Sequence, residues 1–480
     1  MRSLILQGIG WKVVSQIFMQ CSGLLVAITL ARLLRPHEFG LAGMVLVATS
    51  LVLVFSDLAL GAALVQRKEV TEADRSTAFW TSVAIGTMFT AIGIAVSGPV
   101  AAFYGVREVR PLFAVFSLSF LISSLGATQK ALLVREMNFR SLELRMMLGS
   151  LFGGAVGIAM AASGYGAWAI IAQQLTISSV STTLLWIASP WRPRVTYSRA
   201  SLRKLGGFSG NVFGQRLLYQ VTRNTDNVLI GRFLGPAAVG AYSIAYTVML
   251  TPLSRLSGPA MEVMAPALSR MQDDPHRVGT MWLRANRLIA TISIPALLGL
   301  IVVTEEFVHV VLGDRWHAAV PVLRILAWVG ILQAMQNLNE DVLMALDRTR
   351  RMLGYMVLWS SCNIAAFVIG LRWGIVGVAA AFALAGTVLA PIAVILTGRT
   401  AYVSFREYAA NLSGVVQAAI VMAAVVFVAK LGLLSVHVPP LGRLLLLVPL
   451  GVAVYVPLAV WRLPDVVAEL RQLRPTPATS

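Results

Sequence analysis

Long apolar segments alternate with short polar connectors along the whole chain, and this alternation limits the folds open to it. A helix crosses the hydrocarbon core of a bilayer with about 20 mainly apolar residues, since each residue rises about 1.5 Å through a layer about 30 Å thick. About fourteen segments pass this test. They are residues 9–34, 39–65, 76–104, 109–134, 142–163, 165–188, 208–234, 239–268, 285–312, 318–346, 353–371, 375–396, 410–431 and 441–460. We therefore predict an all-α polytopic membrane protein.

The composition excludes a soluble protein. Charged residues make up 12% and apolar residues 57% of the 480, whereas a soluble domain carries about 25% charged residues. No connector between the apolar segments exceeds roughly 20 residues, which is too short for a separate folded domain. Recognition and transport are therefore expected among the helices.

Positive charge dominates the polar connectors. The chain has 39 Lys and Arg against 21 Asp and Glu, a formal charge of +18. Without a long basic face or interleaved aromatic residues, this excess argues against a nucleic-acid partner and favours contacts with anionic lipids. Most of these cations fall on alternate connectors, such as residues 191–204, which places that side and both termini in the cytoplasm.

An internal repeat links two helix-to-helix joints. Residues 30–40 and 230–240 align at an offset of 200, and six predicted spans separate them. The matched residues are Arg32 with Arg232, Leu34 with Leu234, Pro36 with Pro236 and Gly40 with Gly240. Duplication predicts a parallel repeat of two six-helix lobes, at 1–190 and 191–400, followed by two extra helices and a tail at 401–480. The alternative is a chance match between two tight joints.

Polar side chains follow one face of the leading helix of each predicted lobe. Gln16 and Gln20 are one helical turn apart, and the repeat offset places Gln20 opposite Gln220. Arg216 and Arg223 mark a similar face of the seventh span. We expect these two faces to line a central cavity.

Charged groups inside the apolar segments are the candidates for function, because an unpaired ion deep in a bilayer costs several kcal/mol. Arginine presents a planar fork that binds phosphate or carboxylate, so Arg216 and Arg223 predict a cavity for an anionic substrate. The alternative for Arg223 is a structural pair with Asp226. Arg255 either joins this substrate site or, like Arg324, extends to the membrane surface.

Acidic residues offer candidates for coupling transport to an ion or proton. Asp226 follows the arginines of the seventh span, and Glu340 and Asp341 end a polar stripe on the tenth. A hydrated helix end is the alternative for the last two. We expect Glu305 and Glu306, near the outer end of the ninth span, to be hydrated.

Several classes of site have no support in the sequence. The two cysteines, Cys21 and Cys362, each lie in an apolar segment, and the five histidines show no metal-ligand spacing. No glycine-rich phosphate loop, nucleophile elbow or zinc-protease motif occurs. We therefore predict neither a metal, nor a cofactor, nor a catalytic centre.

These joints also carry a family resemblance. The first joint, residues 30–40, followed by Asp57-Leu58-Ala59-Leu60-Gly61, resembles the start of polysaccharide transporters, as do residues 226–232 and Gly240-Ala241-Tyr242. That family holds the O-antigen, colanic acid and exopolysaccharide flippases of the multidrug/oligosaccharidyl-lipid/polysaccharide superfamily. The resemblance implies two lobes with alternating access in a bacterial inner membrane. It also implies a substrate, an anionic oligosaccharide linked to polyprenyl pyrophosphate, and partners that include a polysaccharide polymerase and a chain-length regulator.

Two other functions are compatible with the residues. Cation-coupled multidrug efflux by the same fold is one, although cationic drugs favour acidic sites and the charge within these spans is mainly basic. A membrane-bound polysaccharide polymerase is the other, although the chain lacks a sizeable external loop to carry its chemistry.

Overall fold

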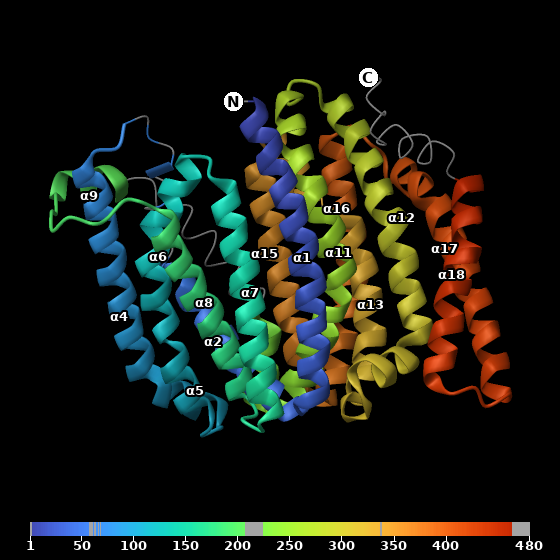
Figure 1. Cartoon of the computed structure of the whole chain (residues 1–480). Coiled ribbons are helices and arrows are strands. Elements are labelled where there is room, and N and C mark those ends of the chain that lie inside the picture. The colour runs from blue at the N-terminus through green and yellow to red at the C-terminus, as the bar shows by residue number, and fades with distance from the viewer. Residues whose placement is uncertain are drawn as a thin grey trace, which may run out of the picture. The chain divides into compact units, whose positions relative to one another are not determined.

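The computed structural model describes residues 2–56, 61, 64–65, 67, 69–206, 224–336 and 338–462. In that part of the chain all regular structure is helical. The chain divides into two compact units, Met1–Gly240 and Ala241–Ser480, and Figure 1 shows long helices running side by side within each unit. The predicted all-α class is thereby confirmed. The division at residues 190 and 400 rests on the repeat and stays a prediction.

The first unit is formed by the helices that lead up to Gly240. They are α1 (Arg2–Leu33), α2 (Pro36–Ser56), α4 (Glu72–Tyr104), α5 (Val109–Phe116), α6 (Leu118–Arg135), α7 (Phe139–Ala162), α8 (Trp168–Ala188) and the short α9 (Arg199–Gly206). Helix α4 begins with a capping box, in which the Thr71 hydroxyl accepts from the Asp74 amide at 3.2 Å and Asp74 accepts from the Thr71 amide at 3.1 Å. It ends at Gly105, whose φ of 69° suits the left-handed turn that follows.

The second unit begins within the first turns of α11 (Pro236–Arg270). Its other elements are α12 (Pro275–Phe307), the π-helix η1 (Val308–Leu312), the 3-10 turn η2 (Asp314–Trp316), α13 (Ala319–Gln336), α14 (Asn339–Ala345), α15 (Thr349–Gly370), the 3-10 turn η3 (Leu371–Trp373), α16 (Gly374–Thr400), α17 (Phe405–Ser435) and α18 (Pro440–Arg462). Helix α12 is not regular to its end, because Val303 departs from helical geometry (φ −98°, ψ 16°) and the π-helix follows.

The predicted spans agree with these helices. Every predicted segment except 208–234, most of which lies outside the described residues, coincides with one described helix or with two consecutive ones. Ten stretches of the described residues are long and apolar enough to cross a membrane, and one of them, Arg350–Thr400, joins α15 and α16. The chain is thus a multi-pass membrane protein.

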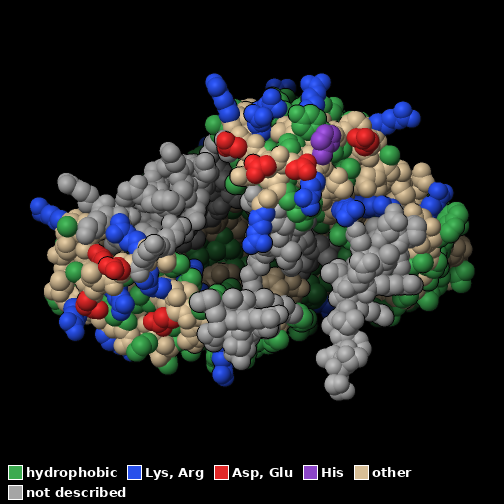
Figure 2. All heavy atoms as spheres, turned by 90° about the horizontal axis from the view of Figure 1, so that it is seen from above, with side chains coloured by type: hydrophobic (Ala, Val, Ile, Leu, Met, Phe, Trp, Pro, Cys, Tyr) green, Lys and Arg blue, Asp and Glu red, His purple; other side chains and the backbone are tan. Residues whose placement is uncertain are grey.

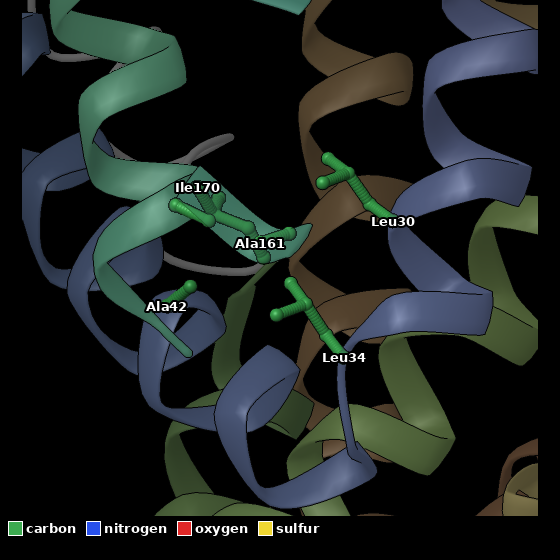
Figure 3. Packing of buried hydrophobic residues seen from close by; sticks show 6 residues of the cluster. Leu30, Leu34, Ala42, Ala161 and Ile170 are labelled. Atoms are coloured by element: carbon green, nitrogen blue, oxygen red, sulfur yellow. The ribbon is translucent and has the colours of Figure 1, made fainter. Parts of the chain in front are cut away.

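One apolar cluster of the first unit lies where α1, α2, α7 and α8 meet. Leu30 and Leu34, at the end of the first helix, pack with Ala42, Ala161 and Ile170 (Figure 3). Leu34 is 1% exposed and Ala42 is fully buried. The small alanine side chains let the helix backbones approach closely. Helices in a membrane associate through such close packing, because lipid is as apolar as the side chains and the hydrophobic effect does not drive them together.

Close approach of α7 and α8 depends on two glycines one turn apart. A Cβ at Gly153 would lie 2.8 Å from the carbonyl oxygen of Gln173, and one at Gly157 would lie 3.0 Å from the Gln173 Cβ. The pair is therefore a packing device that larger residues would push apart.

The two repeat joints meet each other within the first unit. A Cβ at Gly40 would collide with the carbonyl of Pro236, and a Cβ at Gly240 would collide with the carbonyl of Pro36. The same glycines would place their Cβ atoms 3.0 and 3.1 Å from each other's amide nitrogens. A two-fold axis that relates two equivalent segments produces such reciprocal contacts, because each segment then offers the same residues to the other. The contact supports duplication rather than a chance match.

Candidate functional site

Two of the predicted substrate residues lie on α1, outside its contact with α7. The packed face of α1 carries Ser15, fully buried, whose hydroxyl donates to the Glu143 carboxylate of α7. Further along, a Cβ at Gly154 would be 2.6 Å from Val26. Gln16 is exposed and Gln20 is half-buried. Gln16 is therefore open to its surroundings and Gln20 is partly covered, and the role of both residues in binding stays a prediction.

The cationic part of the predicted site falls mostly outside the described residues. Arg216, Gln220 and Arg223 belong to the segment 207–223, which the structure does not describe. Arg255 lies on α11, of which only the backbone is described at that position. The roles of these residues stay predictions.

Asp226 is the first predicted coupling residue, and it is almost completely buried, at 4% exposure. Its carboxylate accepts from the Asn227 backbone amide at 2.7 Å and from the Asn227 side-chain amide at 3.4 Å. A carboxylate this deep in an apolar span needs such donors to stay ionised. The burial keeps Asp226 a candidate for ion coupling.

Glu340 and Asp341 lie at a break in their span, where α13 gives way to α14. Glu340 is exposed and Asp341 is half-buried, and the buried Oδ2 of Asp341 has no hydrogen-bond partner among the described residues. The neighbouring Asn339 is held by the Trp282 indole, which donates to its Oδ1 at 3.1 Å. The break makes the two carboxylates the end of one helical segment, and their coupling role stays a prediction.

A buried ion pair joins α12 to α17 near the end of each helix. The Lys430 ammonium donates to the Glu306 Oε2 at 2.9 Å and to the Val302 carbonyl at 2.9 Å. Glu306 is 1% exposed and Lys430 is 6% exposed. The Val302 carbonyl lies next to the non-helical Val303, so the lysine supplies a donor where the helix is interrupted.

Three more charged residues complete this cluster, which we call the ion network. Arg443 of α18 lies 3.1 Å from the Glu306 Oε1, and Lys430 also lies 3.6 Å from the Glu305 Oε2. At its edge Arg324 of α13 lies 3.2 Å from the Glu305 Oε1, with both side chains about half exposed. The members are Glu305, Glu306, Arg324, Lys430 and Arg443. The expected hydration fits Glu305 and is wrong for Glu306, because helices α17 and α18 cover it.

The ion network connects the two last helices to the rest of the second unit. A pocket of about 230 Å³ opens beside Glu306 and Arg443, between the π-helix and the start of α18. Each of its two carboxylates is paired with cations from neighbouring helices, so the network is suited to holding these helices together. One feature of the sequence could have indicated the ion network, namely the single lysine in the apolar stretch 410–431.

The chain is similar to a family of proteins and to individual known proteins. The family model described as "Polysaccharide biosynthesis protein" matches residues 29–321. The lipopolysaccharide biosynthesis protein WzxC of Escherichia coli is 27% identical over 387 residues, which are 80% of this chain and 79% of that protein. The succinoglycan biosynthesis transport protein ExoT of Rhizobium meliloti is 29% identical over 67% of this chain and 65% of its own length.

Among solved structures, the inward closed conformation of the lipid II flippase MurJ is similar to this chain. The TM-score is 0.75, and the match covers 95% of this chain and 99% of the other. Since only 15% of the residues are identical, this likeness shows a shared fold.

Proposed function

The chain belongs to the polysaccharide biosynthesis protein family, and from that premise we propose that it is a flippase for a lipid-linked oligosaccharide. The observation that carries the proposal is the family match over residues 29–321, which runs from the end of α1 into α13 and so includes helices of both units. The proposed substrate is an anionic oligosaccharide on a polyprenyl pyrophosphate. It moves from the cytoplasmic to the periplasmic leaflet of a bacterial inner membrane, for exopolysaccharide, capsule or O-antigen synthesis.

The residues proposed for the substrate suit its two polar parts. Arg216, Arg223 and Arg255 would bind pyrophosphate or acidic sugars, because guanidinium groups pair with such anions through two hydrogen bonds at once. The amides of Gln16, Gln20 and Gln220 both donate and accept, so they suit sugar hydroxyls. The polyprenyl tail stays in the lipid. Asp226, Glu340 and Asp341 are the proposed places for a coupling ion or proton.

Orientation and partners follow from the direction of transport. The bias of Lys and Arg among the connectors supports both termini in the cytoplasm. A flipped oligosaccharide would be released where a polysaccharide polymerase and a chain-length regulator extend it, which makes these two proteins the expected partners.

The test is transport by the purified full chain in proteoliposomes. A fluorescent polyprenyl-pyrophosphate oligosaccharide is incorporated into the vesicle membrane. The fraction of its fluorescence that an impermeant quencher outside the vesicles removes is then followed with time. The double variant Arg216→Ala/Arg223→Ala is expected to slow flipping at least tenfold, and Arg350→Ala/Arg399→Ala, which removes two exposed arginines, serves as the matched control. Unchanged flipping in the first variant would remove the cationic site from the proposal.

The two other functions give different results in cells. Deletion of a multidrug exporter raises susceptibility to cationic drugs and leaves the polysaccharide intact. Deletion of a polymerase shortens the polymer while lipid-linked repeat units still reach the outer leaflet. The flippase proposal predicts that these units accumulate on the cytoplasmic side.

A further inference from the structure

The connector between α8 and α9, together with the first residue of α9, lies along the first turns of α4, and we call this segment the strap (residues 191–199). Main-chain groups of the strap bond to side chains on one face of α4. The Arg194 amide donates to the Ser76 hydroxyl at 3.2 Å, and the Trp80 indole donates to the Arg194 carbonyl at 2.9 Å. The Ser198 amide donates to the Thr77 hydroxyl at 3.0 Å. Ser76 and Thr77 are fully buried, so these bonds fix the strap in place.

Aromatic side chains support the strap from beneath. The buried Phe79 ring lies 5.3 Å from Trp80, 5.9 Å from Trp186 and 6.1 Å from Trp191, all edge-on. The Trp191 indole donates to Glu72 at 2.9 Å. Tryptophans gathered where transmembrane helices end, here on α4, on α8 and just after α8, are typical of the membrane–water boundary, where an apolar ring with one polar edge is most stable.

The outer surface of the strap combines free cations with exposed apolar groups. Arg194 and Arg199 are exposed, and neither guanidinium has a hydrogen-bond or ion-pair partner within the described part of the chain. Between them Val195 is 95% exposed and Tyr197 is 54% exposed. Arg192 differs, because its guanidinium bonds the Ser189 and Trp191 carbonyls and lies over the Trp186 ring.

The length of α4 sets the depth of the strap. Its 33 residues span about 50 Å, against about 30 Å of hydrocarbon, so a centred helix extends about 10 Å beyond each boundary. About seven residues then project at the end that carries the strap, which puts Ser76 in the headgroup layer and Trp80 at its inner edge. The face that includes this end carries many Lys and Arg side chains, with Asp and Glu among them (Figure 2), and α9 lies at the same end of the first unit (Figure 1).

We propose that the strap is a binding site for the phosphate headgroups of anionic phospholipids in the cytoplasmic leaflet. Arg194 and Arg199 bind the lipid phosphates, while Val195 and Tyr197 enter the upper acyl region. A membrane fits better than an acidic soluble protein, because the tryptophans and the length of α4 put these residues at headgroup depth. The site shares no residue with the proposed substrate site and does not rest on flippase activity.

The first experiment measures lipid binding to the full chain. Wild type and Arg194→Gln/Arg199→Gln are titrated in neutral detergent with phosphatidylglycerol, and bound lipid is counted by native mass spectrometry. Each basic residue at an anionic surface contributes about fivefold, so the double variant should lose roughly 30-fold in apparent affinity at one site. Arg107→Gln/Arg110→Gln removes two exposed arginines near the other end of α4 and should bind as wild type does.

A second arm separates a lipid headgroup from free phosphate. Inorganic pyrophosphate is added to the wild type with phosphatidylglycerol present. Retention of the lipid supports the proposal, whereas its displacement would assign the strap to a soluble phosphate compound. Equal lipid binding by the wild type and the strap variant would also overturn the proposal.

A third measurement reports how deeply the strap lies in the membrane and does not depend on the affinity of the strap for lipid. In a Cys21→Ser/Cys362→Ser background, a spin label at Val195→Cys is compared with one at Gln272→Cys, an exposed position between α11 and α12. In phosphatidylcholine and phosphatidylglycerol vesicles, the label at 195 should collide more with oxygen and less with a nickel chelate than the label at 272. Equal access to the chelate would show a strap in water, free for a soluble partner, and the lipid site would be rejected.

Discussion

Charged side chains are used in opposite ways in the ion network of the second unit and in the strap of the first. In the network, Glu306 and Lys430 are buried, and the protein itself supplies their counter-charges. In the strap, the main chain is bonded to α4, and the side chains of Arg194 and Arg199 extend outward. Buried ions require a partner in the fold because water cannot solvate them. An exposed charged side chain without a partner is available to a ligand. The exposure of a charged side chain therefore distinguishes the charges that stabilise this fold from those proposed to bind a ligand.

The largest effect is expected from breaking the buried pair. Lys430→Met keeps the length of the side chain and removes its charge, which leaves Glu306 buried with Arg443 alone. We expect a loss of about 3 kcal/mol in unfolding free energy, because an incompletely paired buried charge is strongly destabilising. Thermal unfolding in detergent measures it. In a cycle with Glu306→Gln the two changes should couple by about 1 kcal/mol or more, and strictly additive effects would contradict a direct interaction.

A smaller effect is expected from loosening the strap. Thr77→Val preserves shape and removes the hydroxyl that accepts from the Ser198 amide, which should cost about 1 kcal/mol locally. Hydrogen exchange at the Ser198 amide should become several times faster. Thr87→Val on the same helix removes a hydroxyl that bonds only its own helix, to the Val83 carbonyl, and should leave that amide unchanged. Equal exchange in both variants would mean that the strap is held by other contacts.

The exposed edge of the ion network should behave differently from its centre. Arg324→Gln breaks the pair with Glu305, in which the two side chains are 45% and 58% exposed. Surface pairs contribute about 0.5 kcal/mol or less. The melting temperature should therefore shift far less than in Lys430→Met, and added salt should abolish the shift. A loss comparable to that of Lys430→Met would erase the distinction between centre and edge.

The smallest change in stability is expected in the strap itself. Arg194→Gln/Arg199→Gln should melt at the temperature of the wild type in neutral detergent, because no described group of the protein pairs with either guanidinium. The same variant loses lipid binding by the proposal above. Destabilisation without added lipid would show that these arginines are structural, like Lys430.

Several features of this fold could be predicted from local patterns. Apolar length located each span outside 207–223, since crossing a bilayer imposes the same requirement on every helix. The joints at Pro36 and Pro236 indicated duplication, and the close contact of Gly40 with Gly240 has the symmetry that a duplication requires.

Hydropathy and spacing describe a chain one segment at a time, and they determined the fold class and the spans of this protein, whereas the repeat stays a prediction. Only the tertiary structure decided which charges are buried together. Glu306 and Lys430 are 124 residues apart, and no local pattern reveals that α17 covers the end of α12. Likewise the basic connector was visible as composition, but its anchorage to Ser76, Thr77 and Trp80 depends on the packing of both α4 and α8 against α6. The reason is physical, because solvation of a charge is set by its neighbours in space.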